Sequence, residues 1–209
     1  MKTLIAAAAL LATFGTAQAQ LSFTGGANLM AIGAYNPSGS TTTQTQGKED
    51  SLISVGSGGT LTATFLGFEA QDTDTFGFNF GGGLITNKTG VADVTAVSGA
   101  VPAGNLVFSF VDTAMAQSVG NGGNPSDVVY ASYAILGTFA GGVFTPYTKG
   151  GLYDLVLGFN DGLRSDADFD DLVVGLKLTP AVPEPQTYAL LMAGLGAVGF
   201  VARRRNRRD

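Results

Sequence analysis

Apolar side chains recur at every second position in several short stretches of this chain. Leu61, Ala63 and Phe65 interleave with threonines, and Phe76 and Phe78 repeat the pattern a few residues later. This period places alternate side chains on opposite faces of a β-strand, one face of which is buried. Because no segment between the two ends of the chain shows a convincing 3.6-residue period, we predict an all-β fold.

Glycine-rich turns separate these strand-like stretches. Glycine accounts for 31 of the 209 residues and clusters at residues 56–59, 81–83 and 121–123, where it supplies the backbone conformations of tight turns. Short strands between such turns are typical of sandwiches and barrels. We therefore predict a single antiparallel β-sandwich, jelly-roll-like in topology, over residues 20–180. A partly closed barrel is the alternative.

The composition narrows the chemistry that this chain can perform. It contains no cysteine, histidine or tryptophan, which excludes disulfides, nucleophiles activated by imidazole, and zinc sites built from thiolates or imidazoles. We therefore predict that the protein is not an enzyme. A weaker alternative is a glycosidase that uses two carboxylates, such as Glu69 with Asp161.

The N-terminal residues have the three parts of a secretory signal peptide. Lys2 precedes an apolar stretch at residues 4–14, and Ala17-Gln18-Ala19 follows as a small-residue cleavage site. We predict that residues 1–19 form a signal peptide, cleaved between Ala19 and Gln20, and that the rest of the chain is exported.

The C-terminal residues combine a proline-rich motif, a short uncharged stretch and a cluster of arginines. The uncharged residues 189–202 make only about 21 Å of helix, against about 30 Å for the hydrocarbon core of a membrane. Tyr188 and snorkelling arginines extend this length, so we predict a transmembrane helix at about residues 187–202. The arginines favour the cytoplasmic side, which places the preceding domain in the periplasm. The motif residues are Pro183, Glu184, Pro185, Arg203, Arg204 and Arg205.

This order of features resembles the PEP-CTERM sorting signal of exported proteins of Gram-negative bacteria, and the resemblance covers residues 182–209. It implies that a membrane-embedded exosortase recognises and processes the tail. It also implies inner-membrane anchoring before processing, followed by sorting to the cell envelope or extracellular matrix. Proteins with this signal are often associated with exopolysaccharide and biofilms.

The chain between the two terminal signals is strongly acidic. Five basic residues stand there against fourteen acidic ones, a net charge of −9 compared with −5 for the whole chain. Such a charge disfavours binding to nucleic acid and to anionic lipid, and it suits divalent cations. We therefore expect no nucleic-acid partner.

The densest group of acids lies towards the end of the domain. Asp166, Asp168 and Asp170 alternate along the chain, which places three carboxylates on one side of an extended segment. Calcium takes six to eight oxygen ligands, and alternating aspartates supply them. The segment is not an EF-hand, because Asp171 and Lys177 stand where that loop needs glycine and glutamate. The predicted calcium ligands are Asp161, Asp166, Asp168 and Asp170.

This aspartate-rich segment resembles the closing hairpin of many exported PEP-CTERM proteins and is similar to calcium-associated β-sandwich modules of bacterial surface proteins. The alternative is a turn without metal, in which the aspartates accept backbone N–H groups. The order Leu-Gly-Phe, acidic loop, Asp-x-Asp, Phe occurs at both residues 66–76 and residues 157–169. We therefore expect two hairpins side by side, with Glu69, Asp72 and Asp74 near the later cluster.

These features together predict an exported structural protein of the cell surface or extracellular matrix, stabilised by calcium. The alternative is a carbohydrate-binding module for exopolysaccharide, although the lack of tryptophan weakens it. Its stacking faces would be Tyr130, Tyr133, Tyr147 and Tyr153.

Overall fold

The structure is a computed structural model of the whole chain. It describes residues 20–30, 32, 46–79, 83–123, 131–161, 168–181 and 185–205. The predicted signal peptide, residues 1–19, therefore lies outside the described residues, whereas Gln20 lies within them.

The described residues form fifteen β-strands and one α-helix, in agreement with the predicted all-β fold. The elements are β1 (Leu21–Thr24), β2 (Ala27–Leu29), β3 (Gln46–Glu49), β4 (Leu52–Val55), β5 (Gly59–Gly67), β6 (Asp74–Phe78), β7 (Leu84–Thr86), β8 (Ala96–Val101), β9 (Gly104–Asn105), β10 (Phe108–Asp112), β11 (Gln117–Gly120), β12 (Ser132–Ala140), β13 (Val143–Pro146), β14 (Leu155–Asn160), β15 (Leu172–Pro180) and α1 (Pro185–Arg205).

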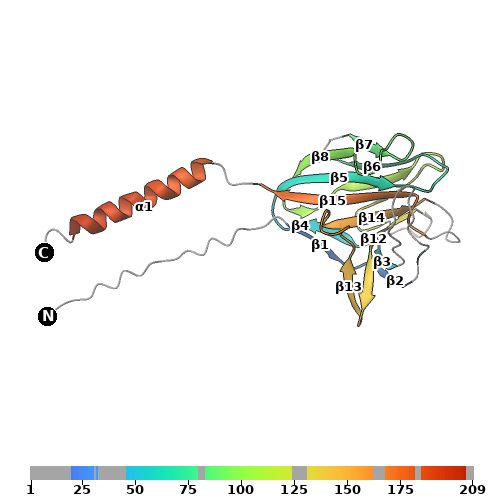
Figure 1. The fold of residues 1–209 in the computed structure, drawn as a ribbon, viewed down its shortest axis with the longest axis horizontal. Coiled ribbons are helices and arrows are strands. Elements are labelled where there is room, and N and C mark those ends of the chain that lie inside the picture. The colour runs from blue at the N-terminus through green and yellow to red at the C-terminus, as the bar shows by residue number, and fades with distance from the viewer. Residues whose placement is uncertain are drawn as a thin grey trace.

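The strands are arranged in three sheets, and every strand pair is antiparallel. The largest sheet has eight strands in the order β2-β3-β12-β14-β15-β5-β8, with β13 also paired to β12. A four-stranded sheet has the order β11-β10-β6-β7, and a three-stranded sheet has the order β1-β4-β9. Figure 1 shows how the long strands β5, β15 and β14 lie side by side.

One apolar core joins the three sheets, because its buried side chains come from strands of all of them. Phe110 of β10 stacks on Phe159 of β14, with ring centroids 5.0 Å apart and planes 5° apart. Phe108 meets Tyr133 of β12 edge to face at 5.3 Å. The large sheet thus packs against the two smaller ones, which supports the predicted antiparallel sandwich; the strand order does not establish a jelly roll.

The alternation read from the sequence agrees with the burial of β5. Leu61, Ala63 and Phe65 are buried, whereas Thr60 and Thr62 of the opposite face are exposed or half-buried. Over residues 60–65 this strand therefore has one face in the core, as a period of two dictates.

Strand β15 differs because both of its faces are covered. Leu172 and Val174 lie in the main core, whereas Val173 lies in a second apolar cluster on the other face of the large sheet. Phe169 and Tyr153, from segments outside the strands, cover that second face. Burial on both faces explains the almost continuous apolar sequence of β15.

A hydrogen-bonded junction at Asn121 links the sheets. The side-chain oxygen of Asn121 accepts from the N–H of Ile53 in β4 at 2.8 Å, and its amide group donates to the carbonyls of Ile53 and Leu106 at 2.7 and 2.8 Å. The buried Tyr133 hydroxyl donates to the carbonyl of Ser51 and accepts from the N–H of Gly122 at 3.2 Å. Segments of all three sheets therefore meet around two side chains.

The C-terminal helix α1 stands apart from the sheets in Figure 1, and its residues 191–200 are exposed. The sequence predicted a transmembrane helix at about residues 187–202. A helix does form over these residues, but none in the described part of the chain is long and apolar enough to cross a membrane. The uncharged stretch ends after fourteen residues at Arg203, Arg204 and Arg205, which occupy the last turn.

We expect Asn121→Ala to lower the free energy of unfolding by about 2–4 kcal/mol, because it leaves the Ile53 N–H and the Leu106 carbonyl without their partner. Urea unfolding followed by circular dichroism measures this change. Asn105→Ala is the matched control, since the Asn105 side chain accepts only an exposed hydrogen bond from Ser54 at 2.8 Å. The control should differ from the wild type by less than about 0.5 kcal/mol; equal losses in both variants would contradict the importance of the junction.

Candidate metal centre

Two loops that are distant in sequence meet at one end of the large sheet. Gly67, the last residue of β5, pairs with Val173 near the start of β15. The antiparallel pairing places the segment after β5 beside the segment before β15. The backbone N–H of Glu69 then donates to the carbonyl of Asp170 at 2.9 Å. The internal repeat in the sequence predicted this juxtaposition.

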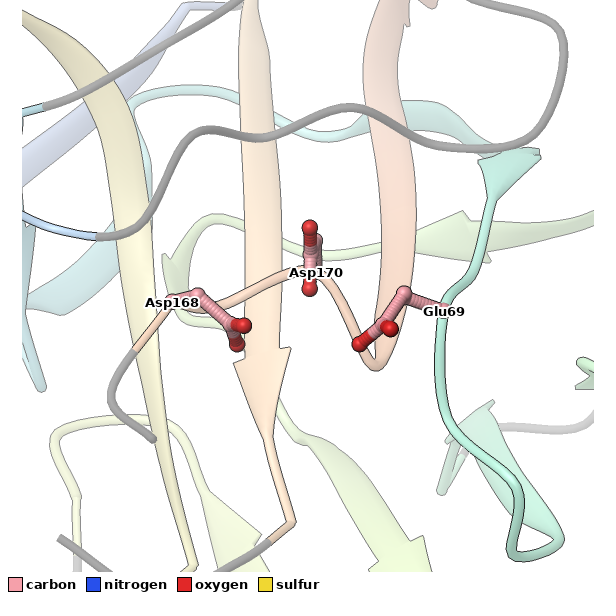
Figure 2. Close-up of side chains that lie close together, drawn as sticks. All are labelled: Glu69, Asp168 and Asp170. Atoms are coloured by element: carbon pink, nitrogen blue, oxygen red, sulfur yellow. The ribbon is translucent and has the colours of Figure 1, made fainter. Parts of the chain in front are cut away.

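The two loops bring together the carboxylates of Glu69, Asp168 and Asp170 (Figure 2). One oxygen from each residue lies within 4.8 Å of the other two. Oxygens bound to one calcium ion at 2.3–2.6 Å lie no farther apart than about 5 Å, so this spacing fits a single ion. Glu69 is exposed, Asp168 is half-buried and Asp170 is buried. Among the described residues, this trio is the group of acids whose spacing suits a metal.

Phe169 holds the later loop in place between its two acidic neighbours. Its side chain is fully buried in the second apolar cluster, and its φ of 61° lies in the left-handed region that few non-glycine residues adopt. The backbone at Phe169 also lies directly over Gly158 of β14, where a Cβ atom would overlap the Phe169 carbonyl. Burial of this ring therefore fixes the loop while its neighbours Asp168 and Asp170 turn towards Glu69.

The structure brings only some of the predicted ligands together. Asp168 and Asp170 belong to the trio, whereas Asp166 lies outside the described residues. Asp161 is not part of the trio, and its backbone N–H donates to the side chain of Asp171 at 2.8 Å. Glu69 was not predicted as a ligand, although the repeat predicted that it lies near the later cluster.

Further carboxylates lie nearby between the layers. Burial and, to a smaller extent, the neighbouring carboxylates of Asp161 and Asp112 together raise the pKa of Asp74 to about 8. The pKa of Asp171 is also raised to about 8, mainly by burial and in smaller part by the charge of Asp161. One oxygen of Asp74 accepts from Asn87 at 3.0 Å, and the other is buried with no hydrogen-bond partner among the described residues. At neutral pH the protons held by Asp74 and Asp171 therefore limit the negative charge at this end of the domain.

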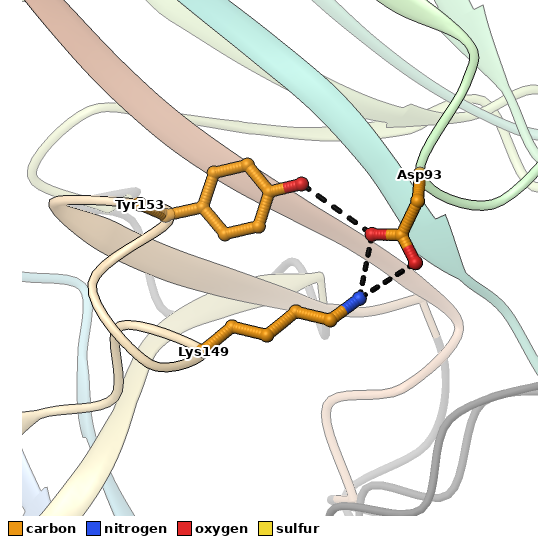
Figure 3. Close-up of polar contacts among 3 residues, drawn as sticks. All are labelled: Asp93, Lys149 and Tyr153. Atoms are coloured by element: carbon orange, nitrogen blue, oxygen red, sulfur yellow. Dashed lines mark hydrogen bonds and ion pairs between the residues drawn. The ribbon is translucent and has the colours of Figure 1, made fainter.

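The tyrosines predicted as stacking faces are poorly placed for that role. Tyr133 is fully buried, and Tyr153 is 9% exposed with its ring against Gly175. Figure 3 shows the Tyr153 hydroxyl donating to Asp93 at 3.4 Å, while Lys149 pairs with the same carboxylate at 2.5 Å. Tyr147 is half-buried, and Tyr130 lies outside the described residues.

The tail of the chain matches a known family. Residues 181–206 match the model of the PEP-CTERM protein-sorting motif. The chain carries a PEP-CTERM sorting signal. This signal implies export, processing by an exosortase and sorting to the cell surface. Pro185 is the first residue of α1, whereas Pro183 and Glu184 lie outside the described residues.

No curated protein and no solved structure matches this chain. The match to the sorting motif begins only after the last strand of the β-domain ends, so the function of the domain is inferred from its own geometry.

The raised pKa of Asp74 predicts a pH dependence of stability in calcium-free buffer. The folded protein keeps a proton on Asp74 that the unfolded chain, with an ordinary pKa near 4, releases. The contribution of this group is complete below about pH 4 and is lost as the pH rises towards 8, with a slope of up to about 1.4 kcal/mol per pH unit. We expect Asp74→Asn to lower this slope in urea unfolding between pH 4 and pH 8, while the raised pKa of Asp171 maintains the remainder. Asp72→Asn, at an exposed position two residues away, should keep the full slope; an unchanged slope in Asp74→Asn would contradict the assignment.

Proposed function

We propose that this protein is a non-enzymatic structural protein of the cell surface or extracellular matrix, and that calcium bound at Glu69, Asp168 and Asp170 stabilises its β-domain. The sorting signal supports the location. The convergence of three carboxylates from two separate loops is the observation that carries the role of calcium.

The chemistry of the trio favours calcium over other metals. All three ligands are carboxylate oxygens, and the chain has no histidine or cysteine for a softer metal. Calcium tolerates irregular coordination and completes its shell with water or backbone carbonyls, whereas magnesium demands near-ideal octahedral geometry. A bound cation also offsets the mutual repulsion of the carboxylates, which strengthens as they are buried.

The position of the trio suits a protein held by its tail. Strand β15 begins beside the acidic loop and ends at Pro180, next to the sorting signal. Its nine residues span about 30 Å. The calcium end of the domain is therefore the end farthest from the tail. In this proposal exopolysaccharide is the matrix that surrounds the protein and is not a ligand that it binds. The described tyrosines offer little open surface on which a sugar could stack.

Calcium binding is tested by calorimetric titration of the purified protein and by thermal unfolding with and without 1 mM calcium. A dissociation constant of about 10–100 μM raises the unfolding midpoint by about 3–8 °C. We expect Glu69→Gln and Asp168→Asn to lose most of this shift, because each removes a charged ligand. Asp72→Asn removes a nearby charge outside the trio and should keep the shift. No shift in the wild-type protein, with no metal co-purifying, would overturn the calcium role.

Sorting is tested separately by changing the motif that precedes the helix. We expect Glu184→Ala to block processing, so that the protein from cells retains its full C-terminal mass in mass spectrometry. Glu49→Ala changes a glutamate of the β-domain and should be processed like the wild type. Equal processing of both variants would contradict a role for Glu184. The same spectra report whether the mature protein begins at Gln20.

A further inference from the structure

A lysine holds the loop that carries Glu69. The ammonium group of Lys88 donates to the carbonyls of Ala70 and Gln71, at 3.3 and 2.5 Å. It also lies 5.6 Å from the centre of the Phe68 ring, within cation–π range. Lys88 therefore contacts the residues on both sides of Glu69 in the chain.

The residue before this lysine holds the next part of the same loop. The side-chain amide of Asn87 donates to the carbonyl of Asp72 at 2.9 Å and to the carboxylate of Asp74 at 3.0 Å. Its oxygen accepts from the N–H of Asp74 at 3.1 Å. Asn87 and Lys88 together, which we call the Asn87–Lys88 clamp, fix the loop from Phe68 to Asp74.

The clamp has a rigid base. It follows directly after β7, whose Ile85 is fully buried and pairs with Phe76 of β6. Asn87 is itself buried, and its N–H donates to the carbonyl of Asp74 at 3.1 Å. A side chain extended from such a base holds its partner more firmly than one extended from a free loop.

We propose that the Asn87–Lys88 clamp is a positioning device that sets the cation affinity of the trio by holding Glu69 against Asp168 and Asp170. This inference rests on the proposed calcium site. Phe169 fixes the loop that carries the two aspartates, and the clamp fixes the loop that carries the third ligand. In this proposal Asn87 and Lys88 act through the loop and are not ligands of the ion.

Removal of Lys88 can either strengthen or weaken calcium binding, and the direction of the change shows how Lys88 acts. If Lys88 acted only through its charge, its removal would relieve repulsion of the cation and strengthen binding, by about twofold to fourfold at a separation of ~10 Å. If Lys88 positions Glu69, its removal weakens binding, and loss of a residue that orients a metal ligand typically costs about 10–100-fold in affinity. The two effects have opposite signs, and the second is the larger.

The experiment measures calcium affinity by calorimetry for the wild type, Lys88→Met and Lys88→Arg. We expect Lys88→Met to bind calcium at least about tenfold more weakly. Lys88→Arg keeps the charge and the donors, so it should bind within about threefold of the wild type. Lys177→Met is the matched control, because it removes an equal charge far from the site. Lys177 lies six residues along β15 from Asp171, about 20 Å away, so its loss should leave the affinity unchanged.

Unfolding in calcium-free buffer identifies a variant that simply fails to fold. If Lys88→Met is unfolded, Lys88→Gln, which keeps a donor without the charge, takes its place with the same expected loss. Unchanged or stronger binding by a folded variant without the charge, alongside normal binding by the wild type, would overturn the positioning role alone. Absence of binding by the wild type would instead overturn the proposed calcium site itself.

Discussion

The fold depends on one hydrogen-bonded junction, in which Asn121 and Tyr133 link segments of three sheets. The chain has no cysteine and therefore no disulfides to fix the packing of its sheets. The Asn121 side chain bonds the backbone N–H of Ile53 and the carbonyl of Leu106. The Tyr133 side chain crosses the apolar core, and its hydroxyl donates to the carbonyl of Ser51. Each of these backbone groups would cost about 1–3 kcal/mol if it were buried without a partner. Because two side chains bond these backbone groups, the sheets can pack against one another without leaving them unpaired.

The acidic end of the domain relies on the same closed layers. The stacked rings of Phe110 and Phe159 fix β10 and β14 relative to each other. The positions of β5 and β14 in turn determine where the loops that follow them lie. Buried carboxylates are then held where their pKa is raised, a state that is stable only because packing elsewhere compensates its cost. A cation or a proton at this end relieves the repulsion.

The sequence predicted the strands best where one face is buried, as in β5, because a period of two is then visible. In β15 the alternation separated Leu172 and Val174 from Val173, as the structure confirms, but it did not show which face lies in the main core, since both faces are apolar. Asn121 was read as part of a turn; its role depends on Ile53, which is 68 residues away in sequence, and no local pattern encodes such a contact. The repeat of Leu-Gly-Phe and Asp-x-Asp did predict that the acidic loops meet. Glu69 was missed as a ligand because ligand spacing was sought within one loop.

The burial of β15 between β14 and β5 also has a mechanical consequence. A tensile force applied through the tail enters the domain at Pro180 and runs along β15. The hydrogen bonds to β14 and β5 lie across the direction of pull, so they share the load in shear and do not open one by one. Extraction of the strand would require both ladders to break together and would drag the acidic loop through the core. Strand β15 is thus the element best placed to carry a tensile load from Pro180 to the opposite end of the domain.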